Sequence, residues 1–134
     1  MKRAAMAAAL LAACSGGEVD LVGPDGAVVH AYTNVTYATT PDARAQGLVG
    51  HAPLGPNDAM VLEYPVVDQA CITNAQVDFA ITAIFVDGSG KIAAVDSLAA
   101  HDALVPCHDG VLDVVETDAA GATFATAASR VSFH

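Results

Sequence analysis

The chain has 134 residues, which suits a single domain whose core is large enough to fold without a partner. Hydrophobic residues make up 54% of it, but many are alanine, there is no tryptophan, and the core must consist mainly of Val, Leu, Ile and Ala. Five Lys and Arg stand against 15 Asp and Glu, and so acidic a surface repels phosphate backbones, which excludes nucleic acid as an expected partner.

The first 13 residues indicate an export signal. Lys2 and Arg3 form a positive start, and Ala4 to Leu10 form an apolar stretch. The following Leu11-Ala12-Ala13-Cys14 resembles the lipobox of bacterial lipoproteins, whose cysteine becomes lipidated and then forms the mature N-terminus. Ser15-Gly16-Gly17 would be a flexible tether. The alternatives are an ordinary secretory peptide and a buried, alanine-rich N-terminal helix.

Cleavage before Cys14 leaves three basic residues against 15 acidic ones, a formal charge of −12. Residues 14–26 would then hold the lipidated N-terminus, the tether and a first short strand, and residues 27–134 a single β-rich domain. The lipid would hold the protein to the periplasmic side of a bacterial membrane. Ser15 after the lipidated position is typical of outer-membrane lipoproteins.

Strand and turn signals begin at Val19. Val19 to Val22 predicts a short strand, Gly23 to Gly26 a turn, and Ala27 to Ala38 is β-rich but broken at Thr33-Asn34. This stretch predicts a hairpin.

One short helix is expected at residues 41–46. Thr40 supplies an N-capping hydroxyl, Pro41 suits the first helical position, and Asp42 lies near the positive end of the helix dipole. Gly47 is suited to end the helix in a left-handed conformation.

The centre of the chain predicts a strand and a hairpin. Ala59 to Tyr64 is the strand, followed by a connection at residues 65–69. Ala80 to Val86 and Lys91 to Leu98 are paired strands around the turn at Asp87 to Gly90.

The C-terminal third adds a loop at residues 99–110, a strand at Val111 to Glu116, a short helical turn within residues 118–128 and a last strand at Arg130 to Phe133. The sum is about seven or eight short strands with one short helix near residues 41–46. We therefore expect a mainly β (α+β) fold, a compact, mostly antiparallel and barrel-like sheet.

Five separated pieces of the chain resemble a family of short, often exported bacterial proteins, the domain-of-unknown-function family number 192. The pieces are the helix start Thr40-Pro41-Asp42 with Arg44, Gly47-Leu48-Val49, Met60-Val61-Leu62, the turn Phe85 to Gly90, and Val111 to Glu116 with Ala120-Gly121. The resemblance implies a mainly β, barrel-like domain and no established activity.

The family also has the signature tryptophan-methionine-any-asparagine-threonine, followed by an aspartate. The resemblance implies a shared polar pocket at these positions, where this chain has Thr73, Gln76 and Thr82. A pocket near these residues is therefore the first place to look for a function.

Cys71 and Cys107 remain once Cys14 is assigned to the lipid. In an oxidising compartment they could form a disulfide that closes a loop of about 36 residues, or they could remain two unpaired small hydrophobic residues. The sequence does not decide between the disulfide and the two unpaired cysteines.

A metal site is the alternative role for this region. His101, Cys107 and His108 share one predicted loop, and His51 could join them as ligands of Zn or Cu. The spacing matches no standard zinc finger, and a disulfide at Cys107 would remove the thiolate.

Other chemistry is weakly indicated. A Cys107-His108 dyad is geometrically poor because neighbouring side chains of an extended chain point to opposite faces. Asp87 suits a turn, and Asp78, Asp96 and Glu116 suit solvent-facing strand ends.

The sequence thus predicts a lipid-anchored envelope domain that binds a small ligand or a partner protein, with no enzymatic activity and no cofactor. The alternative is a metal-handling or hydrolytic envelope protein that uses His101, Cys107 and His108.

Overall fold

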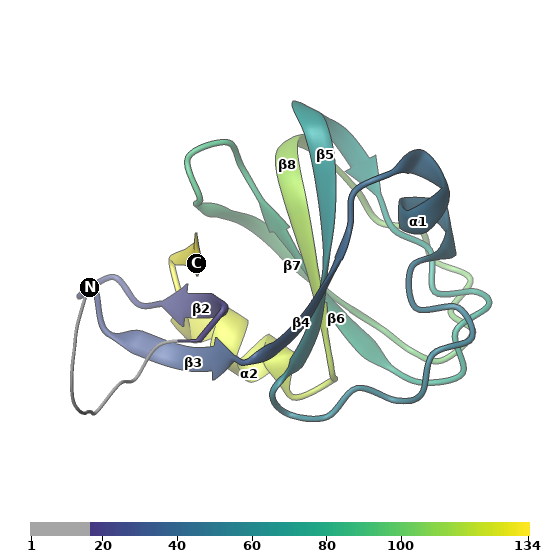
Figure 1. Ribbon diagram of the computed structural model, residues 1–134, viewed down its shortest axis with the longest axis horizontal. Helices are drawn as coiled ribbons and strands as arrows, with labels where there is room; N and C mark the ends of the chain where they lie inside the picture. The colour runs from purple at the N-terminus through teal and green to yellow at the C-terminus, as the bar shows by residue number, and fades with distance from the viewer. Residues whose placement is uncertain (1–16) are drawn as a thin grey trace.

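The computed structural model describes residues 17–134 (Figure 1). This part contains eight strands and two short helices, so the predicted mainly β fold is confirmed. The predicted signal peptide at residues 1–13 and the predicted lipidation site Cys14 lie outside the described residues.

The strands form two mostly antiparallel sheets, which within residues 17–134 do not close into a barrel. The smaller sheet is antiparallel and has the order β3-β2-β9, with β2 at Val19–Val22, β3 at Val28–Tyr32 and β9 at Arg130–Phe133. The larger sheet has the order β4-β5-β8-β6-β7, with β4 at Asn34–Ala38, β5 at Asp58–Cys71, β6 at Ile81–Val86, β7 at Ile92–Leu98 and β8 at Cys107–Thr117. Only β4 and β5 run parallel.

The predicted first hairpin joins β2 and β3 across the turn at residues 23–26. The chain changes sheet at Thr33, where the backbone N–H groups of Thr33 and Asn34 both donate to the carbonyl of Asn57 at 3.0 Å. The break in the β-rich stretch at Thr33-Asn34 is therefore the point where the chain enters the larger sheet beside β5.

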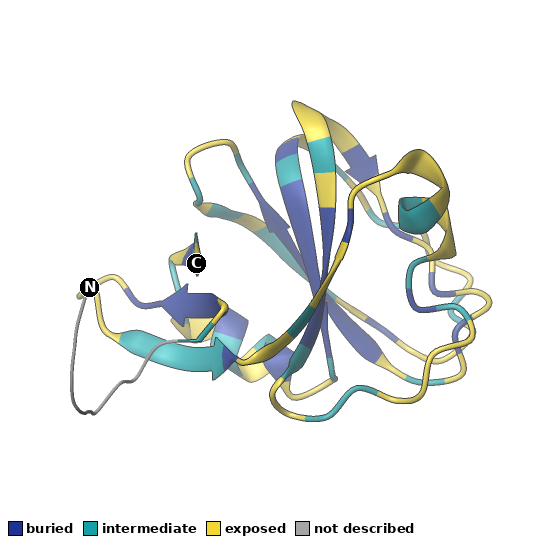
Figure 2. Ribbon diagram, in the orientation of Figure 1, coloured by how far each residue is buried: buried dark blue, intermediate teal, exposed yellow. Residues whose placement is uncertain are grey.

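The central strands of the larger sheet are buried on both faces, because each face is covered by other elements (Figures 1 and 2). One set of alternating side chains packs with the smaller sheet and α2, a helix at Gly121–Ala127; it includes Val61, Ile84 and Val115. The other set packs beneath α1, at Pro41–Gln46, and the loops next to it; it includes Leu62, Phe85 and Val114. Burial on both faces explains why these strands are continuous apolar runs.

Helix α1 has the predicted bounds and caps. The Thr40 hydroxyl accepts a hydrogen bond from the backbone N–H of Ala43 at 3.1 Å, and Pro41 occupies the first turn. Gly47 follows with a φ of +49°, which residues other than glycine rarely adopt. Its ψ of −129° lies outside the left-handed helical region that we predicted. The glycine lets the chain turn sharply back onto the sheet.

Two predicted boundaries are wrong. The predicted connection at residues 65–69 is part of β5, and the predicted loop at 99–110 ends before β8 begins at Cys107. The β5–β8 pairing shifts register between Glu63 and Asp68, around Pro65, which has no N–H to donate, and Gly110 of β8 has a φ of +71°. This irregular pairing lets β5 continue through Pro65, which would end a regularly paired strand.

A disulfide joins Cys71 to Cys107, so the first of the two cysteine alternatives holds. These residues face each other at the end of the β5–β8 pair. Within residues 17–134 the model contains no helix that is both long and apolar enough to cross a membrane.

Removal of this disulfide should destabilise the protein, because the bond closes a loop across a sequence separation of 36 residues. We expect a Cys71→Ser/Cys107→Ser variant to lose about 3–4 kcal/mol of unfolding free energy, measured by urea denaturation in a Cys14→Ala background. Reduction of the parent should give a similar loss, and an unchanged urea midpoint in both cases would contradict the assignment.

Candidate functional site

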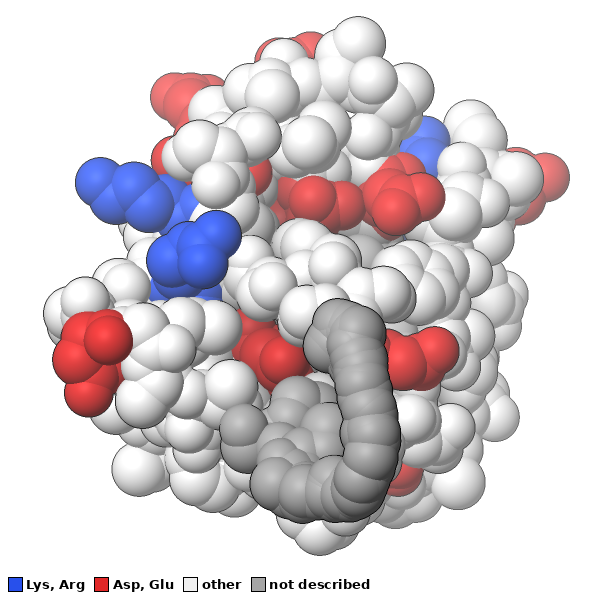
Figure 3. Space-filling model, turned by 60° about the vertical axis from the view of Figure 1, so that its left-hand side comes forward, with Lys and Arg blue, Asp and Glu red and all other residues white. Residues whose placement is uncertain are grey.

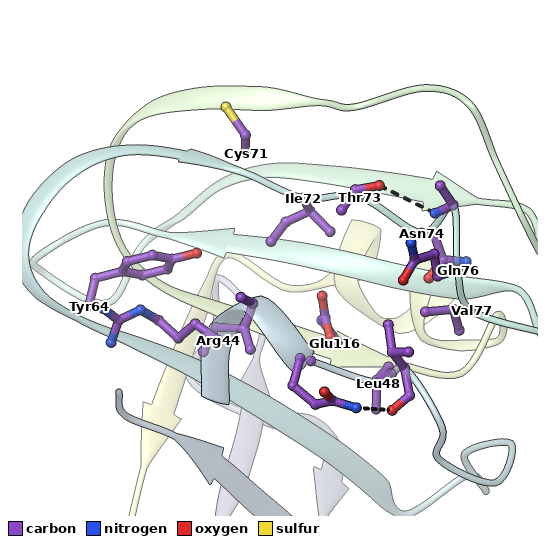
Figure 4. A pocket seen from close by; sticks show the side chains of 16 residues that line it. Arg44, Leu48, Tyr64, Cys71, Ile72, Thr73, Asn74, Gln76, Val77 and Glu116 are labelled. Atoms are coloured by element: carbon purple, nitrogen blue, oxygen red, sulfur yellow. Dashed lines mark hydrogen bonds between the residues drawn. The ribbon is translucent and has the colours of Figure 1, made fainter. Parts of the chain in front are cut away.

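A cavity of about 290 Å³ lies on the face of the larger sheet that packs beneath α1 (Figure 4). Three parts of the chain surround it: α1 with the residues that follow it, the segment after β5, and strands β5 and β8 from below. The side chains that bear on its chemistry are those of Arg44, Tyr64, Thr73, Asn74, Gln76 and Glu116.

Glu116 forms the floor of the cavity. It alternates along β8 with Val115, so it lies on the same face of the sheet as Val114, and its side chain points into the cavity (Figure 4). The residue is only 4% exposed, and its carboxyl group makes no hydrogen bond or ion pair to any residue of the described chain. A buried, unpartnered carboxyl group is costly, so this side chain marks the cavity as more than a packing defect.

Gly47 lies directly beside this carboxyl. A Cβ atom built on Gly47 would stand 3.9 Å from Oε1 of Glu116. The glycine that ends α1 therefore also leaves space above the floor of the cavity.

Burial raises the pKa of Glu116 to about 7. The pKa of Tyr64 is also raised, first by its own burial; the positive charge of Arg44 lowers it and the negative charge of Glu116 raises it. These two opposite charges therefore both act on the phenol at the edge of the cavity.

Arg44 is held at the rim by backbone groups and an aromatic ring. Its Nη1 donates to the carbonyls of Thr39 at 3.0 Å and Glu63 at 2.9 Å, and its guanidinium lies 5.0 Å from the centre of the Tyr64 ring. Because these contacts hold the guanidinium at the rim, it forms no ion pair with Glu116 within the described chain.

The segment at residues 72–77, which we call the roof, is fixed by Asn74. This residue is fully buried, and its Nδ2 donates to the carbonyls of Phe79 at 3.0 Å and Ala99 at 2.9 Å. Because both partners are acceptors, the amide orientation is determined, and Oδ1 is left buried without a partner in the described chain. Asn74 thus holds the roof while leaving one acceptor unused.

His101 and the disulfide hold the roof from outside. The backbone N–H of His101 donates to the carbonyl of Val77, and its Nδ1 hydrogen-bonds the carbonyl of Ala75, each at 3.0 Å. At the other end of the roof, Cys71 is bonded to Cys107 and the N–H of Ile72 donates to the carbonyl of Pro106. The cavity is therefore preformed.

Two of the three predicted pocket residues line this cavity. Thr73 and Gln76 belong to the roof, but Thr82 does not reach the cavity. Thr82 alternates with Ala83 on β6, so it faces the opposite side of the sheet, where it is fully buried and its hydroxyl donates to the carbonyl of Ala119.

The predicted metal ligands are not brought together. Cys107 is in the disulfide, His101 lies beside the roof and pairs with Asp78 at 3.0 Å, and His108 pairs with Asp96 at 2.6 Å. Residues 17–134 contain no group of three or more His, Cys, Asp and Glu side chains that could hold a metal ion. His51, predicted as a further ligand, therefore belongs to no such group either. Cys107, which was predicted to supply a thiolate ligand, has no thiolate because it is disulfide-bonded.

The predicted roles of the carboxylates need one correction. Asp87 does stabilise its turn, since its Oδ1 accepts hydrogen bonds from the N–H groups of Ser89 and Lys91 at 2.9 Å. Glu116, however, is buried at the centre of the sheet and does not face solvent. Asp96 and Asp78 are the partners of the histidines.

Sequence reasoning missed Asn74 and Glu116 as cavity residues. The signal for Asn74 was present: in Cys71-Ile72-Thr73-Asn74-Ala75 it occupies the asparagine position of the five-residue family signature. For Glu116 the signal was a lone acidic residue inside the apolar run Val111 to Thr117.

Comparisons with known proteins agree with this fold. The model of the family DUF192, described as "Uncharacterized ACR", matches residues 23–127, and no curated protein sequence matches the chain. The chain is similar in structure to a protein of Sinorhizobium meliloti described as a proposed transcription regulator, with a TM-score of 0.76 and 20% identity over 86% of this chain and 91% of that one. It is also similar to a protein of unknown function from Novosphingobium aromaticivorans, with a TM-score of 0.73 and 20% identity over 86% of this chain and 83% of that one.

The raised pKa of Glu116 predicts a pH-dependent loss of stability. Between about pH 4.5, the unfolded value, and pH 7, the unfolded chain has released this proton while the folded protein retains it, so stability falls as the pH rises. Replacing Glu116 by Gln removes this contribution. The unfolding free energy of Glu116→Gln minus that of the parent should therefore rise by up to roughly 3 kcal/mol between pH 4.5 and pH 7.5.

Urea denaturation across this pH range measures the difference. Asp113→Asn is the matched control, because Asp113 lies on the same strand outside the cavity and its pKa is raised to about 6 by burial and by the charge of Glu63. Its effect should develop at lower pH, between about 4 and 6. A pH-independent difference for Glu116→Gln would contradict the prediction.

Proposed function

The chain belongs to the DUF192 family of uncharacterised proteins, and we propose that it is a binding domain that holds a small molecule in the cavity above Glu116. The observation that carries this proposal is the carboxyl of Glu116, which is buried in a preformed cavity without a partner from the described chain. Selection for stability alone would replace such a group, whereas a ligand that contacts it gives it a function.

The side chains around the cavity favour binding over catalysis. Within residues 17–134, Glu116 is the single carboxyl group that lines the cavity, and no histidine lines it. The Thr73 hydroxyl accepts a hydrogen bond from the N–H of Ala75 and has no neighbouring base in the cavity. A nucleophile with its base, or a pair of carboxylates for glycoside hydrolysis, would need further groups. A cavity that combines apolar walls with converging polar side chains suits recognition of a small molecule.

Export and lipid anchoring belong to the same proposal. We infer that residues 1–13 are a signal peptide and that lipidated Cys14 holds the domain to the periplasmic side of a bacterial membrane, in the outer membrane because Ser15 follows. The disulfide between Cys71 and Cys107 supports export, since such bonds persist in oxidising compartments such as the periplasm.

Nucleic-acid binding is not part of the proposal, although one structural neighbour is described as a proposed transcription regulator. Three Lys and Arg stand against 15 Asp and Glu in residues 17–134. Acidic side chains occur at several separate points on the face shown in Figure 3, beside the few basic ones. A surface of this charge repels a phosphate backbone.

Blocking the cavity should abolish binding. Ala75 is exposed and lines the cavity, so a tryptophan in its place would fill the space while leaving the backbone contact of Ala75 to His101 intact. In two-dimensional NMR with a library of small polar metabolites, we expect compounds that shift the amide signals of Gly47 and of residues 73–77. Their affinity should fall about tenfold or more in Ala75→Trp.

Ala103→Trp is the control, since Ala103 is exposed and does not line this cavity. This variant should bind as the parent does. The proposal fails if no compound shifts the cavity signals, or if the compounds bind Ala75→Trp as well as they bind the parent.

The anchor is tested separately in cells. A Cys14→Ala variant should move from the membrane fraction to the soluble periplasmic fraction, because it cannot be lipidated. Persistence of this variant in the membrane fraction would show that the lipobox interpretation is wrong.

A further inference from the structure

Both unpartnered polar groups among the described residues that line the cavity are hydrogen-bond acceptors, but Oδ1 of Asn74 has almost no exposed surface, so Glu116 is the acceptor that a ligand can reach. Glu116 presents a carboxyl group that makes no hydrogen bond to the described chain, and Asn74 has its buried Oδ1 unused. An ionised carboxylate and an amide oxygen only accept. The complementary ligand group is therefore a donor, and a carboxylate shielded from water pairs most strongly with a donor that is positively charged.

Residues 17–134 supply no cation for this carboxylate. Among the described residues, Arg44 is the one basic residue that lines the cavity, and its guanidinium is engaged with the carbonyls of Thr39 and Glu63 above the Tyr64 ring. No other charged residue of the described chain faces Glu116 from the surrounding elements. The acidic surface, with 15 Asp and Glu in the chain, raises the local concentration of cations around the cavity.

A metal ion does not fit this set of donors. Ca²⁺ and Mg²⁺ require about six oxygen ligands, and Zn²⁺ requires three or four side-chain ligands. The cavity offers one carboxyl group and neutral oxygens, and no group of three potential metal ligands exists within residues 17–134. The donor set therefore favours an organic cation.

A quaternary ammonium does not fit either. Such groups cannot donate hydrogen bonds, and proteins hold them in cages of several aromatic rings. Tyr64 is the single aromatic residue of the described chain that lines the cavity, and Arg44 occupies its ring face at 5.0 Å. A cation that carries N–H groups is the better match for the Glu116 carboxylate.

The remaining walls accept a hydrocarbon chain. They include the apolar side chains of Leu48, Val49, Leu62, Ile72 and Val77, beside the polar side chains of Gln46, Thr73 and Gln76. A volume of about 290 Å³ corresponds to roughly ten water-sized groups, so the ligand is small.

We propose that the cavity binds a small primary amine, whose ammonium group donates to the Glu116 carboxylate while its carbon chain packs on the apolar walls. This inference rests on the proposed function, since it names the chemical class of the ligand for the same cavity. Ammonium binding requires the ionised carboxylate, so binding releases a proton when Glu116 is protonated beforehand.

The test uses n-butylammonium and its neutral counterpart 1-butanol, with tetramethylammonium as a third probe. Each is titrated at pH 8 into the parent, Glu116→Gln and Asp113→Asn proteins and followed by two-dimensional NMR. We expect n-butylammonium to shift the signals of Gly47 and residues 73–77 more strongly than either other probe. Its affinity should fall about 10- to 100-fold in Glu116→Gln and stay unchanged in Asp113→Asn.

A second measurement avoids the variants. In the parent protein the affinity for n-butylammonium should fall as the pH is lowered from 8 to 6, while that for 1-butanol should stay constant, because only the amine needs the ionised carboxylate. Arg44 does not titrate in this range. A pH-independent amine affinity would overturn the inference even if Glu116→Gln failed to fold.

Failure of this inference differs from failure of the proposed function. Equal binding of n-butylammonium and 1-butanol, or shifts spread over surface carboxylates outside the cavity, would overturn the ligand class. If cavity-specific compounds of other chemistry are still lost in Ala75→Trp, the proposed binding function survives. If no compound of any class shifts the cavity signals, both fall.

Discussion

Glu116 sits at the centre of a sheet whose strands are buried on both faces, and the arrangement of the cavity follows from its position there. The period of two along β8 places it on the same face as Val114, among apolar side chains. Burial in this position raises the pKa of the carboxyl group to about 7, and the group has no partner from the described chain. The cost of burying such a group supports the proposal that another molecule occupies the space above it.

That space is built by elements that are distant in sequence. Helix α1 stops at Gly47, which stands beside the carboxyl group where a side chain would begin to fill the cavity. The roof is fixed at one end by the disulfide and at the other by Asn74 and His101. A cavity held open in this way does not need to be ordered when a ligand arrives, which favours affinity.

Local signals in the sequence were sufficient for most elements, whereas the site depends on long-range packing. Thr40 and Pro41 predicted α1 because a cap and a proline act within one turn, and residues 87–90 predicted the β6–β7 turn for the same reason.

Pro65 predicted an end of strand β5 that the structure does not have. Its missing N–H is accommodated by irregular pairing with β8, more than 40 residues away in the chain. The division into two sheets also depends on pairing between the ends of the chain, since β9 lies beside β2. The sequence predicts a solvent-facing charge at Glu116, because the burial of this side chain is created by α1 and the roof, which are distant in the chain. Thr82 was predicted to line the pocket but lies on the other face of the sheet, because side chains one residue apart on a strand point to opposite faces.

The central claim is that Glu116 is a desolvated carboxyl group held free for a ligand, and its side-chain carboxyl ¹³C signal tests this most directly. A pH titration of that signal by NMR, in the protein without added ligand, should give a pKa of about 7. A saturating amount of n-butylammonium should lower this pKa, because the bound ammonium stabilises the ionised form. A pKa in the ordinary range of about 4–5 without ligand, or one that n-butylammonium leaves unchanged, would contradict the account.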